Sequence, residues 1–214
     1  MGRGFLWFDS EFSTDDLDHA SLLQVAAIAT DEQLRVLRPE PLEGLQPDEA
    51  RPLGTCILVR PPDDVVVSEF VRKNQAEVLA DAQRRGRAAA DVDRLLAARV
   101  DAQFGAPGEP HTRPTLAGNS IHIDWLLLRR HLPQLARRLH YRVLDVTALK
   151  IEWSVAHGGP KFDKADPARI RAHFPDADLP GGAARHDAYY DAQASIAELA
   201  SYRAGLGRRA SGAP

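Results

Sequence analysis

The chain has 214 residues, which suits one medium-sized globular domain, and its 44% hydrophobic and 27% charged content excludes wholesale disorder and fibrous repeats. A net charge of −3 argues against a protein that coats long nucleic acid by phosphate neutralisation alone. No uncharged stretch is long enough to span a bilayer, and no secretory peptide is expected at the N-terminus. The single cysteine, Cys56, cannot form an internal disulfide, so we expect a cytoplasmic protein.

The first part of the chain predicts three strands. Residues 5–12 form a short, aromatic-rich segment that predicts a buried strand, although it carries two carboxylates. Residues 22–30 predict a second strand, and residues 55–60 predict a third that stops at Pro61 and Pro62. Short polar or Pro/Gly-rich loops join them, which favours an antiparallel three-strand meander.

The rest of the chain alternates between helical and strand patterns. The predicted elements are two amphipathic helices within 67–104, a short strand that begins at 115 and ends at 118–120, a helix divided at Pro133, a strand over 141–146, a helix over 147–156 and a closing helix over 188–202. Residues 157–184, rich in Gly, Pro and Asp, predict a long irregular segment. We therefore expect one α/β domain over residues 1–204, with a mixed sheet flanked by helices and a disordered tail at 205–214.

Asp9 and Glu11 are the acidic residues whose surroundings are least expected. Side chains two positions apart on a strand share a face and lie about 7 Å apart. Burying two like charges costs several kcal/mol unless a cation or hydrogen bonds compensate, and oxygen-only ligands favour Mg²⁺ or Mn²⁺. Taken alone, the pair fits either a metal site or an edge-strand accident. Other acidic pairs with the same spacing are interpreted as a turn, a solvated helix face and a loop: Asp16/Asp18, Asp91/Asp93 and Asp176/Asp178.

Three further residues are candidates for chemistry. Asp124 falls in the first turn of a predicted helix, where an acidic residue could equally serve the helix N-terminus. His186 and Asp191 lie at the start of the last helix and converge only if His186 lies in the entering loop. A histidine there could take a proton, or it could simply be exposed.

In this order, Asp9, Glu11, Asp124, His186 and Asp191 resemble the DEDD superfamily of 3′-to-5′ exonucleases, in its histidine-containing DEDDh branch. Within that superfamily the chain is similar to the oligoribonuclease family. The segments that carry the similarity are FLWFDSEF, LLQVAAIATD, LAGNSIHID, HYRVLDVTALK and the final-helix pattern H-x-A-x-x-D-x-x-x-SIAELA-x-YR. The resemblance implies a ribonuclease H-like fold: a three-strand antiparallel meander plus parallel strands, flanked by α-helices.

The resemblance also implies the chemistry. Asp9, Glu11, Asp124 and Asp191 would hold two Mg²⁺ or Mn²⁺ ions, and His186 would act as the general base toward the attacking water. The substrate would be short single-stranded RNA, down to dinucleotides, degraded from the 3′ end to nucleoside 5′-monophosphates. No organic cofactor and no membrane partner are implied.

Other matching positions concern substrate length. Ser120, Arg142 and Thr147 match family contacts to the substrate's 5′ phosphate, and the Arg142 guanidinium is the best suited because it can meet a phosphate through two parallel hydrogen bonds. From the residues alone, Ser120 could be a turn residue, Thr147 or Asp145 a helix cap, and Arg142 a solvated strand end. Leu17 would be the wedge between bases. Tyr141, with the preceding histidine, matches a segment that family dimers contribute across their interface, so a homodimer is implied.

The chain departs from the family pattern near these positions. Two extra residues and a missing glycine precede Leu17, Gln24 replaces a common glutamate, and Tyr190 replaces an acidic residue. Two alternatives therefore remain open beside the short-RNA hypothesis. One keeps the chemistry but places it on longer single-stranded RNA or DNA ends. The other is a non-catalytic nucleotide-binding dimer.

Overall fold

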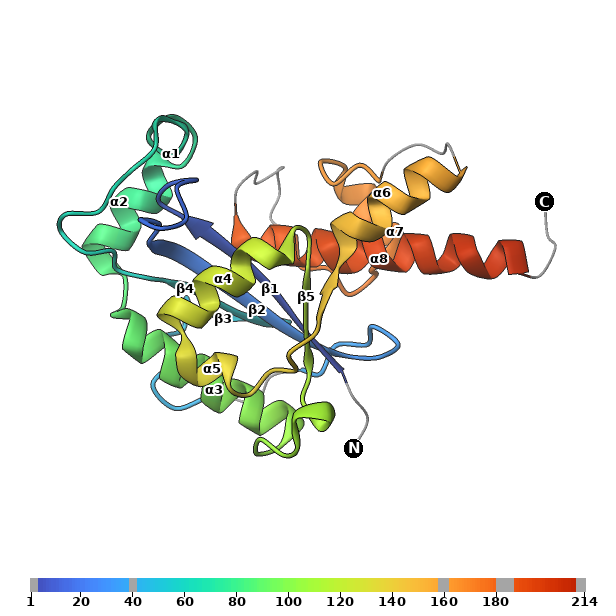
Figure 1. Cartoon of the computed structure of the whole chain (residues 1–214), viewed down its shortest axis with the longest axis horizontal. Coiled ribbons are helices and arrows are strands. Elements are labelled where there is room, and N and C mark those ends of the chain that lie inside the picture. Colours follow the sequence, from blue (N-terminus) through green and yellow to red (C-terminus); the bar gives the residue numbers. More distant parts are fainter. Residues whose placement is uncertain (1–3, 39–41, 158–161, 180–186, 211–214) are drawn as a thin grey trace.

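The computed structural model describes residues 4–38, 42–157, 162–179 and 187–210. Within these residues, six strands form one mixed sheet in the order β3-β4-β2-β1-β5-β6 (Figure 1). The strands β1 (Gly4–Phe12), β2 (Leu22–Asp31) and β4 (Gly54–Leu58) pair antiparallel, which confirms the predicted meander. The two-residue strand β3 (Ala50–Arg51) extends its edge and was not predicted.

The parallel half of the sheet lies on the other side of β1. Strand β5 (Thr115–Gly118) pairs parallel with β1, and β6 (Val143–Asp145) pairs parallel with β5 and forms the edge. The carboxyl ends of β1 and β5 therefore meet at one end of the sheet. The mixed sheet expected from the resemblance is confirmed.

Helices cover both faces of the sheet, because successive side chains of β1 point to opposite sides. Leu6 and Phe8 belong to a core with α3 (Ala89–Phe104), α4 (Ile121–His131) and α5 (Pro133–Ala136). Trp7 belongs to the opposite core, whose centre is α8 (Ala188–Ala210), and its indole Nε1 donates to Thr30 Oγ1 at 2.9 Å. Helices α6 (Val146–His157) and α7 (Pro167–His173) complete that layer (Figure 1).

Two short helices close the end of the sheet where β1 finishes. These are α1 (Glu69–Asn74) and α2 (Ala76–Arg85), and Val71 and Ala82 from them pack on Leu23 of β2. The Ser68 hydroxyl caps α1 by accepting the Val71 N–H. Two helices were predicted between residues 67 and 104, whereas the structure has three.

Three other features differ from the sequence predictions. Helix α7 lies inside the segment 157–184 that was predicted irregular, with Pro167 at its start and Asp166 as its cap. Asp93, predicted on a solvated face, is buried because its carboxylate accepts the backbone N–H groups of Gln134 and Leu135 at the start of α5. Helix α8 continues to Ala210, past the predicted domain end at 204, and residues 211–214 lie outside the described residues.

Gly118 brings α4 close to β1. A Cβ at Gly118 would lie 2.7 Å from the Phe8 carbonyl oxygen and 2.9 Å from Ile121 Cδ1, so only glycine fits between the strand and the helix. The close approach places the first turn of α4, with Asp124, beside the end of β1. Among the described residues, no helix is both long enough and apolar enough to cross a membrane.

Candidate active site

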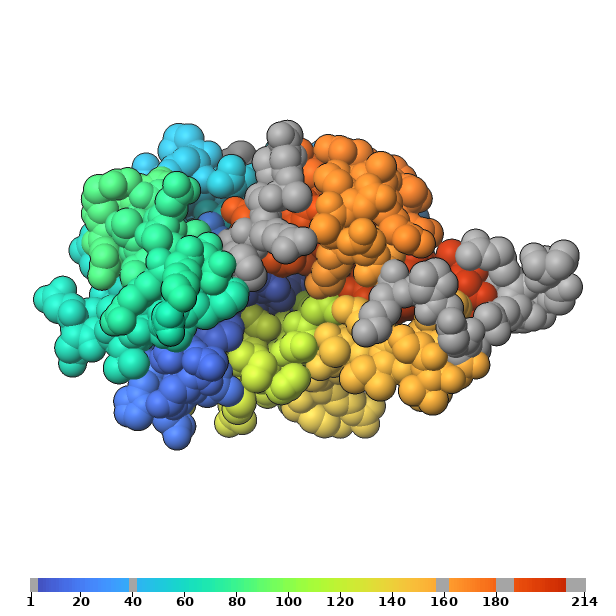
Figure 2. Space-filling view, turned by 90° about the horizontal axis from the view of Figure 1, so that it is seen from above, coloured from blue at the N-terminus to red at the C-terminus, as the bar shows by residue number. Residues whose placement is uncertain are grey.

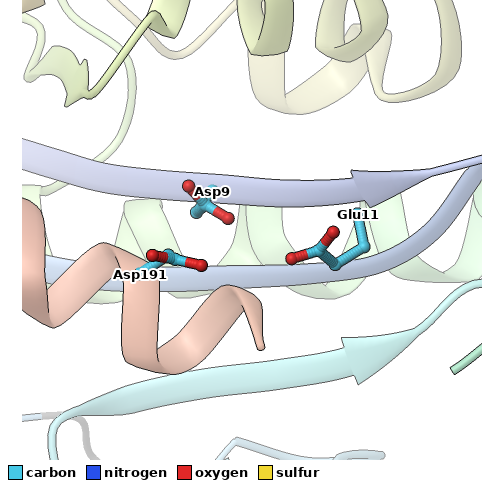
Figure 3. Close-up of side chains that lie close together, drawn as sticks. All are labelled: Asp9, Glu11 and Asp191. Carbon is cyan, nitrogen blue, oxygen red and sulfur yellow. The ribbon is translucent and has the colours of Figure 1, made fainter. Parts of the chain in front are cut away.

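Three carboxylates meet at the end of β1. Asp9, Glu11 and Asp191 each offer an oxygen, and these oxygens all lie within 4.8 Å of one another. Figure 3 shows Asp9 and Glu11 on the strand and Asp191 on α8, with their carboxylates turned toward each other. The structure thus brings together three of the residues predicted from sequence.

The alternation along β1 explains this placement. Asp9 and Glu11 follow Trp7 on the face that α8 covers, and the register of β1 with β2 shifts directly after Glu11. Asp191 lies in the first turn of α8, 180 residues later in the chain, and its N–H donates to the Asp187 carbonyl. Figure 2 shows part of the N-terminal segment, in dark blue, recessed between later parts of the chain.

Asp124 approaches the same end of β1 from α4. Its carboxylate is buried and accepts the Ser10 hydroxyl at 2.6 Å. It lies outside the group of three, yet it is the charge that raises the pKa of Asp9 most after burial itself. Asp124 therefore lies near enough to Asp9 to repel its charge, although it is outside the group of three.

Burial and mutual repulsion hold protons on these groups. Burial raises the pKa of Glu11 to about 8, with further contributions from Asp191 and Asp187. Burial also raises the pKa of Asp124 to about 7, although the Ser10 hydroxyl opposes the shift. The pKa of Asp9 is raised by burial and by the neighbouring carboxylates. The cluster is costly as a set of anions unless a cation neutralises it.

A divalent cation fits this donor set. The ligands are carboxylate oxygens only, which suits a hard ion such as Mg²⁺ or Mn²⁺. The raised pKa values show how unfavourable the ionised cluster is without positive charge. The site therefore supports a divalent metal cofactor.

One lysine already lies close to the cluster. Lys164, between α6 and α7, is largely buried, and burial lowers the pKa of its ammonium while Glu198, Asp191 and Asp9 raise it. Glu198, seven residues after Asp191 on α8, is fully buried. Its carboxylate oxygens lie 3.9 Å from Lys164 Nζ and 3.1 Å from Lys150 Nζ. Glu198 thus holds a fixed positive charge next to the carboxylates.

The start of α8 is fixed to the central strands. Gln24, opposite Glu11 on β2, accepts the Ala188 N–H through its side-chain oxygen at 3.0 Å. Asp187 caps the helix by accepting the Tyr190 N–H at 2.9 Å. The predicted general base, His186, lies outside the described residues, so its role stays a prediction.

A cavity of about 360 Å³ opens beside Glu11. Its described lining comes from the end of β1, the following turn and α1, and most of the surface that it presents to the cavity is apolar. The lining residues are Glu11, Phe12, Thr14, Asp15, Ser68, Phe70, Val71 and Gln75. Leu17, the predicted wedge, is half-buried in the turn and is not part of this described lining. Its carbonyl oxygen accepts from Arg130.

Ser120 and Thr147, predicted to contact phosphate, lie side by side where β5 and β6 end. The Ser120 N–H donates to Thr147 Oγ1 at 2.9 Å, and the two hydroxyl oxygens are 3.3 Å apart. Asp145 accepts both the Ser120 and the Thr147 N–H groups, so it takes the local capping role that the sequence left open. Ser120 has a left-handed backbone with φ of 50°.

A chain of hydrogen bonds links Ser120 and Thr147 to α8, the helix that carries Asp191. Thr147 Oγ1 donates to Asn119 Oδ1 at 3.1 Å, and Asn119 Nδ2 donates to Ser195 Oγ at 2.7 Å. The Ser195 hydroxyl in turn donates to the carbonyl oxygen of Asp191 at 2.9 Å.

Arg142 lies at the other end of β6 from this pair. The three residues of β6, about 10 Å of strand, and Val146 separate it from Thr147. Its guanidinium lies over the Tyr141 ring at 5.3 Å, and Tyr141 stacks on His140. Arg142 and Tyr141 thus form a separate group on the surface of the chain, and Tyr141 is 66% exposed.

Comparison with known proteins gives the family. The chain is 31% identical over 206 residues to an oligoribonuclease of Streptomyces avermitilis, covering 95% of this chain and 86% of the relative. The chain belongs to the oligoribonuclease family. An oligoribonuclease of Streptomyces griseus is 30% identical over the same span, and one of Francisella tularensis is 27% identical over 92% of the chain and 93% of the relative. No protein-family model matches the chain.

Solved structures agree on the fold. The chain is similar to E. coli exonuclease I in a zinc-bound complex with single-stranded DNA, with a TM-score of 0.62 and 17% identity. That match covers 97% of this chain but spans only 42% of the exonuclease I chain. S. pombe Pop2p, in its Mg²⁺- and Mn²⁺-bound form, matches 94% of this chain and 82% of its own, with a TM-score of 0.61 and 12% identity.

Sequence analysis missed two residues that the structure places at the site, Lys164 and Gln75. Gln75 donates its amide N–H to a Glu11 oxygen, and Lys164 lies near Asp9 and Asp191. Neither belongs to a motif. Their segments align with no quoted family stretch, so no sequence signal pointed to them.

Without divalent metal, the free energy of unfolding should fall as the pH rises from about 5 to about 8.5. Glu11 and Asp124 keep protons in the folded protein up to pKa values of about 8 and about 7. The unfolded chain releases them near pH ~4. Their contribution to stability is complete below the unfolded pKa values and is lost as the pH passes the folded ones. Thermal unfolding in EDTA across this range measures the effect.

Asp9→Asn is the comparison variant, because it removes one charge of the cluster. It should flatten the pH dependence, and saturating Mn²⁺ should reduce the decline in the unsubstituted protein. Equal slopes for the two proteins in EDTA would contradict the electrostatic account.

Lys164→Met should tighten Mn²⁺ binding by about three- to ten-fold, because the ammonium repels a cation that enters beside Asp9 and Asp191. Lys150→Met is the matched control, since Lys150 contacts the same Glu198 from α6. It should change the Mn²⁺ affinity less. Calorimetric titration measures both, and weaker binding by the Lys164 variant would count against a purely repulsive role.

Proposed function

We propose that this oligoribonuclease-family protein is a 3′-to-5′ exoribonuclease that degrades short oligoribonucleotides, down to dinucleotides, to nucleoside 5′-monophosphates. The observation that carries the proposal is the meeting of Asp9, Glu11 and Asp191 at the end of β1, with Asp124 beside them. Family membership over 95% of the chain supports the same chemistry.

In this proposal, Asp9, Glu11, Asp124 and Asp191 hold two Mg²⁺ or Mn²⁺ ions. Such ions stabilise the attacking and leaving oxygens of an in-line phosphoryl displacement. Ser10 holds Asp124 in place through its hydroxyl, and Gln24 holds the first turn of α8, which carries Asp191. His186, one residue before that helix's capping aspartate, takes the proton from the attacking water.

The cavity beside Glu11 supports a terminal nucleotide there. Its walls include Phe12 and Phe70, and aromatic side chains are the kind of surface on which nucleic-acid bases stack. A cavity of about 360 Å³ is of the size that holds one small ligand. Leu17 remains the proposed wedge between bases.

The phosphate contacts are best explained by a homodimer. Ser120 and Thr147 lie together, whereas Arg142 and Tyr141 form a separate exposed group beside the edge strand β6. In a dimer, the exposed group of one protomer reaches the site of its partner. Apolar side chains exposed on the neighbouring helix α6, such as the 79% exposed Val155, support a second copy on this side of the molecule.

The substrate assignment is tested by hydrolysis of 5′-labelled RNA of two, five and twenty nucleotides, with Mn²⁺ and with chelator. Fast metal-dependent loss of the dinucleotide, with the twenty-mer nearly untouched, is expected. Asp9→Asn should lower the rate more than about 100-fold, whereas Asp16→Asn, in the exposed turn, should not. Arg142→Ala should slow dinucleotide cleavage by about 10- to 100-fold through loss of charge-assisted hydrogen bonds, with the exposed Arg137→Ala as control.

Degradation of the twenty-mer while the dinucleotide persists would keep the chemistry but move the substrate to longer RNA or DNA ends. Absence of both hydrolysis and Mn²⁺ binding would leave the non-catalytic nucleotide-binding dimer. The three outcomes are distinct in one assay set.

The dimer is tested by sedimentation equilibrium. We expect about twice the chain mass of 23.5 kDa. Val155→Glu should shift the equilibrium to the monomer because it buries a charge in the contact. Val66→Glu, at a 49% exposed valine before α1, is the matched control and should stay dimeric. A monomeric unsubstituted protein would remove the dimer from the proposal.

A further inference from the structure

Gln75 occupies a break in the helical segment beside the acidic cluster. Its φ and ψ of −130° and 24° lie outside the helical region, so α1 ends before it and α2 begins after it. Its N–H still donates to the Val71 carbonyl at 2.9 Å, and the residue is only 6% exposed. The break lets its side chain reach Glu11 instead of following the helix surface.

The position of Gln75 is fixed relative to β1. The Ser68 N–H, at the start of α1, donates to the carbonyl oxygen of Ser13 at 2.9 Å, two residues after Glu11. Val71, on the same helix, is buried against Leu23 of β2. Main-chain bonding and packing therefore hold the helix break against the strand that carries the metal ligands.

The side-chain amide of Gln75 donates to Glu11 through its nitrogen, while its oxygen has no hydrogen-bond partner among the described residues. Its Nε2 donates to Glu11 Oε2, while its Oε1 is buried without a hydrogen-bond partner in the described structure. Leaving a buried carbonyl unpaired costs about 1–3 kcal/mol. The opposite orientation would set that oxygen against a carboxylate, which only accepts when ionised. A glutamine kept for packing alone would not be expected to leave one end unpaired.

We propose that Gln75 is a positioning residue of the active site, which fixes the orientation in which Glu11 binds a divalent metal. The inference rests on the proposed function, because it takes Glu11 as a metal ligand. Groups that hydrogen-bond to a metal ligand set its orientation, and their loss typically costs about 10- to 100-fold in metal affinity or activity.

The test is calorimetric titration of Mn²⁺ into the full-length chain. Gln75→Met keeps the size of the side chain but removes the donor, and should weaken Mn²⁺ binding by about 10- to 100-fold. Gln75→His, which keeps an N–H donor, should recover most of the affinity. Gln103→Met is the matched control. Gln103 lies on α3, away from the site, and donates its amide N–H to the Leu37 carbonyl, so its loss should leave Mn²⁺ binding unchanged. On a dinucleotide, Gln75→Met should lower kcat while KM stays within about threefold.

The outcomes separate the two proposals. Mn²⁺ binding by Gln75→Met that equals the unsubstituted protein overturns the positioning role and leaves the proposed function standing. No Mn²⁺ binding by the unsubstituted protein overturns both. If Gln75→Met unfolds, Gln75→Asn makes the same comparison, because it keeps the amide but shortens its reach by one methylene. Native affinity in a folded asparagine variant would likewise overturn the positioning role.

Discussion

Mutual repulsion among carboxylates at the end of β1 is the constraint on which the other features of the site depend. Asp9, Glu11 and Asp191 lie within ligand distance of one another, and burial raises the pKa values of the first two. Each neighbouring group relieves part of this cost. Lys164 supplies positive charge, Gln75 donates to Glu11, and the Ser10 hydroxyl donates to Asp124. A divalent cation completes the same compensation.

The fold follows from sequence where one face of an element is buried. The short, aromatic-rich segment 5–12 and the apolar run at 22–30 predict β1 and β2 because both strands are enclosed by helices. Two short elements were not predicted from the sequence. Strand β3 has two exposed residues, and α7 is set by the cap at Asp166 and the burial of Ile170 within a Gly- and Pro-rich segment. The burial of Asp93 was not predicted because its hydrogen-bond partners are backbone groups 41 and 42 residues away.

The site residues also differ in how far the sequence alone predicts them. The apolar surroundings of Asp9 and Glu11 identify them as candidate site residues without any family resemblance. Asp124 and Asp191 become candidates only through the resemblance, since each alone fits a helix N-terminus. Gln75 was beyond prediction because its role comes from a break between two helices that the apolar spacing does not show. The roles of His186, Leu17 and the phosphate-binding residues remain predictions.

The acidic cluster joins two parts of the chain that are 180 residues apart. Asp9 and Glu11 are translated well before Asp191, which arrives with α8. Contacts between such distant segments form late, because the intervening loop must close first. A growing chain on the ribosome therefore lacks a complete set of acidic ligands until α8 has been translated. In this architecture the acidic cluster cannot assemble before that helix is made.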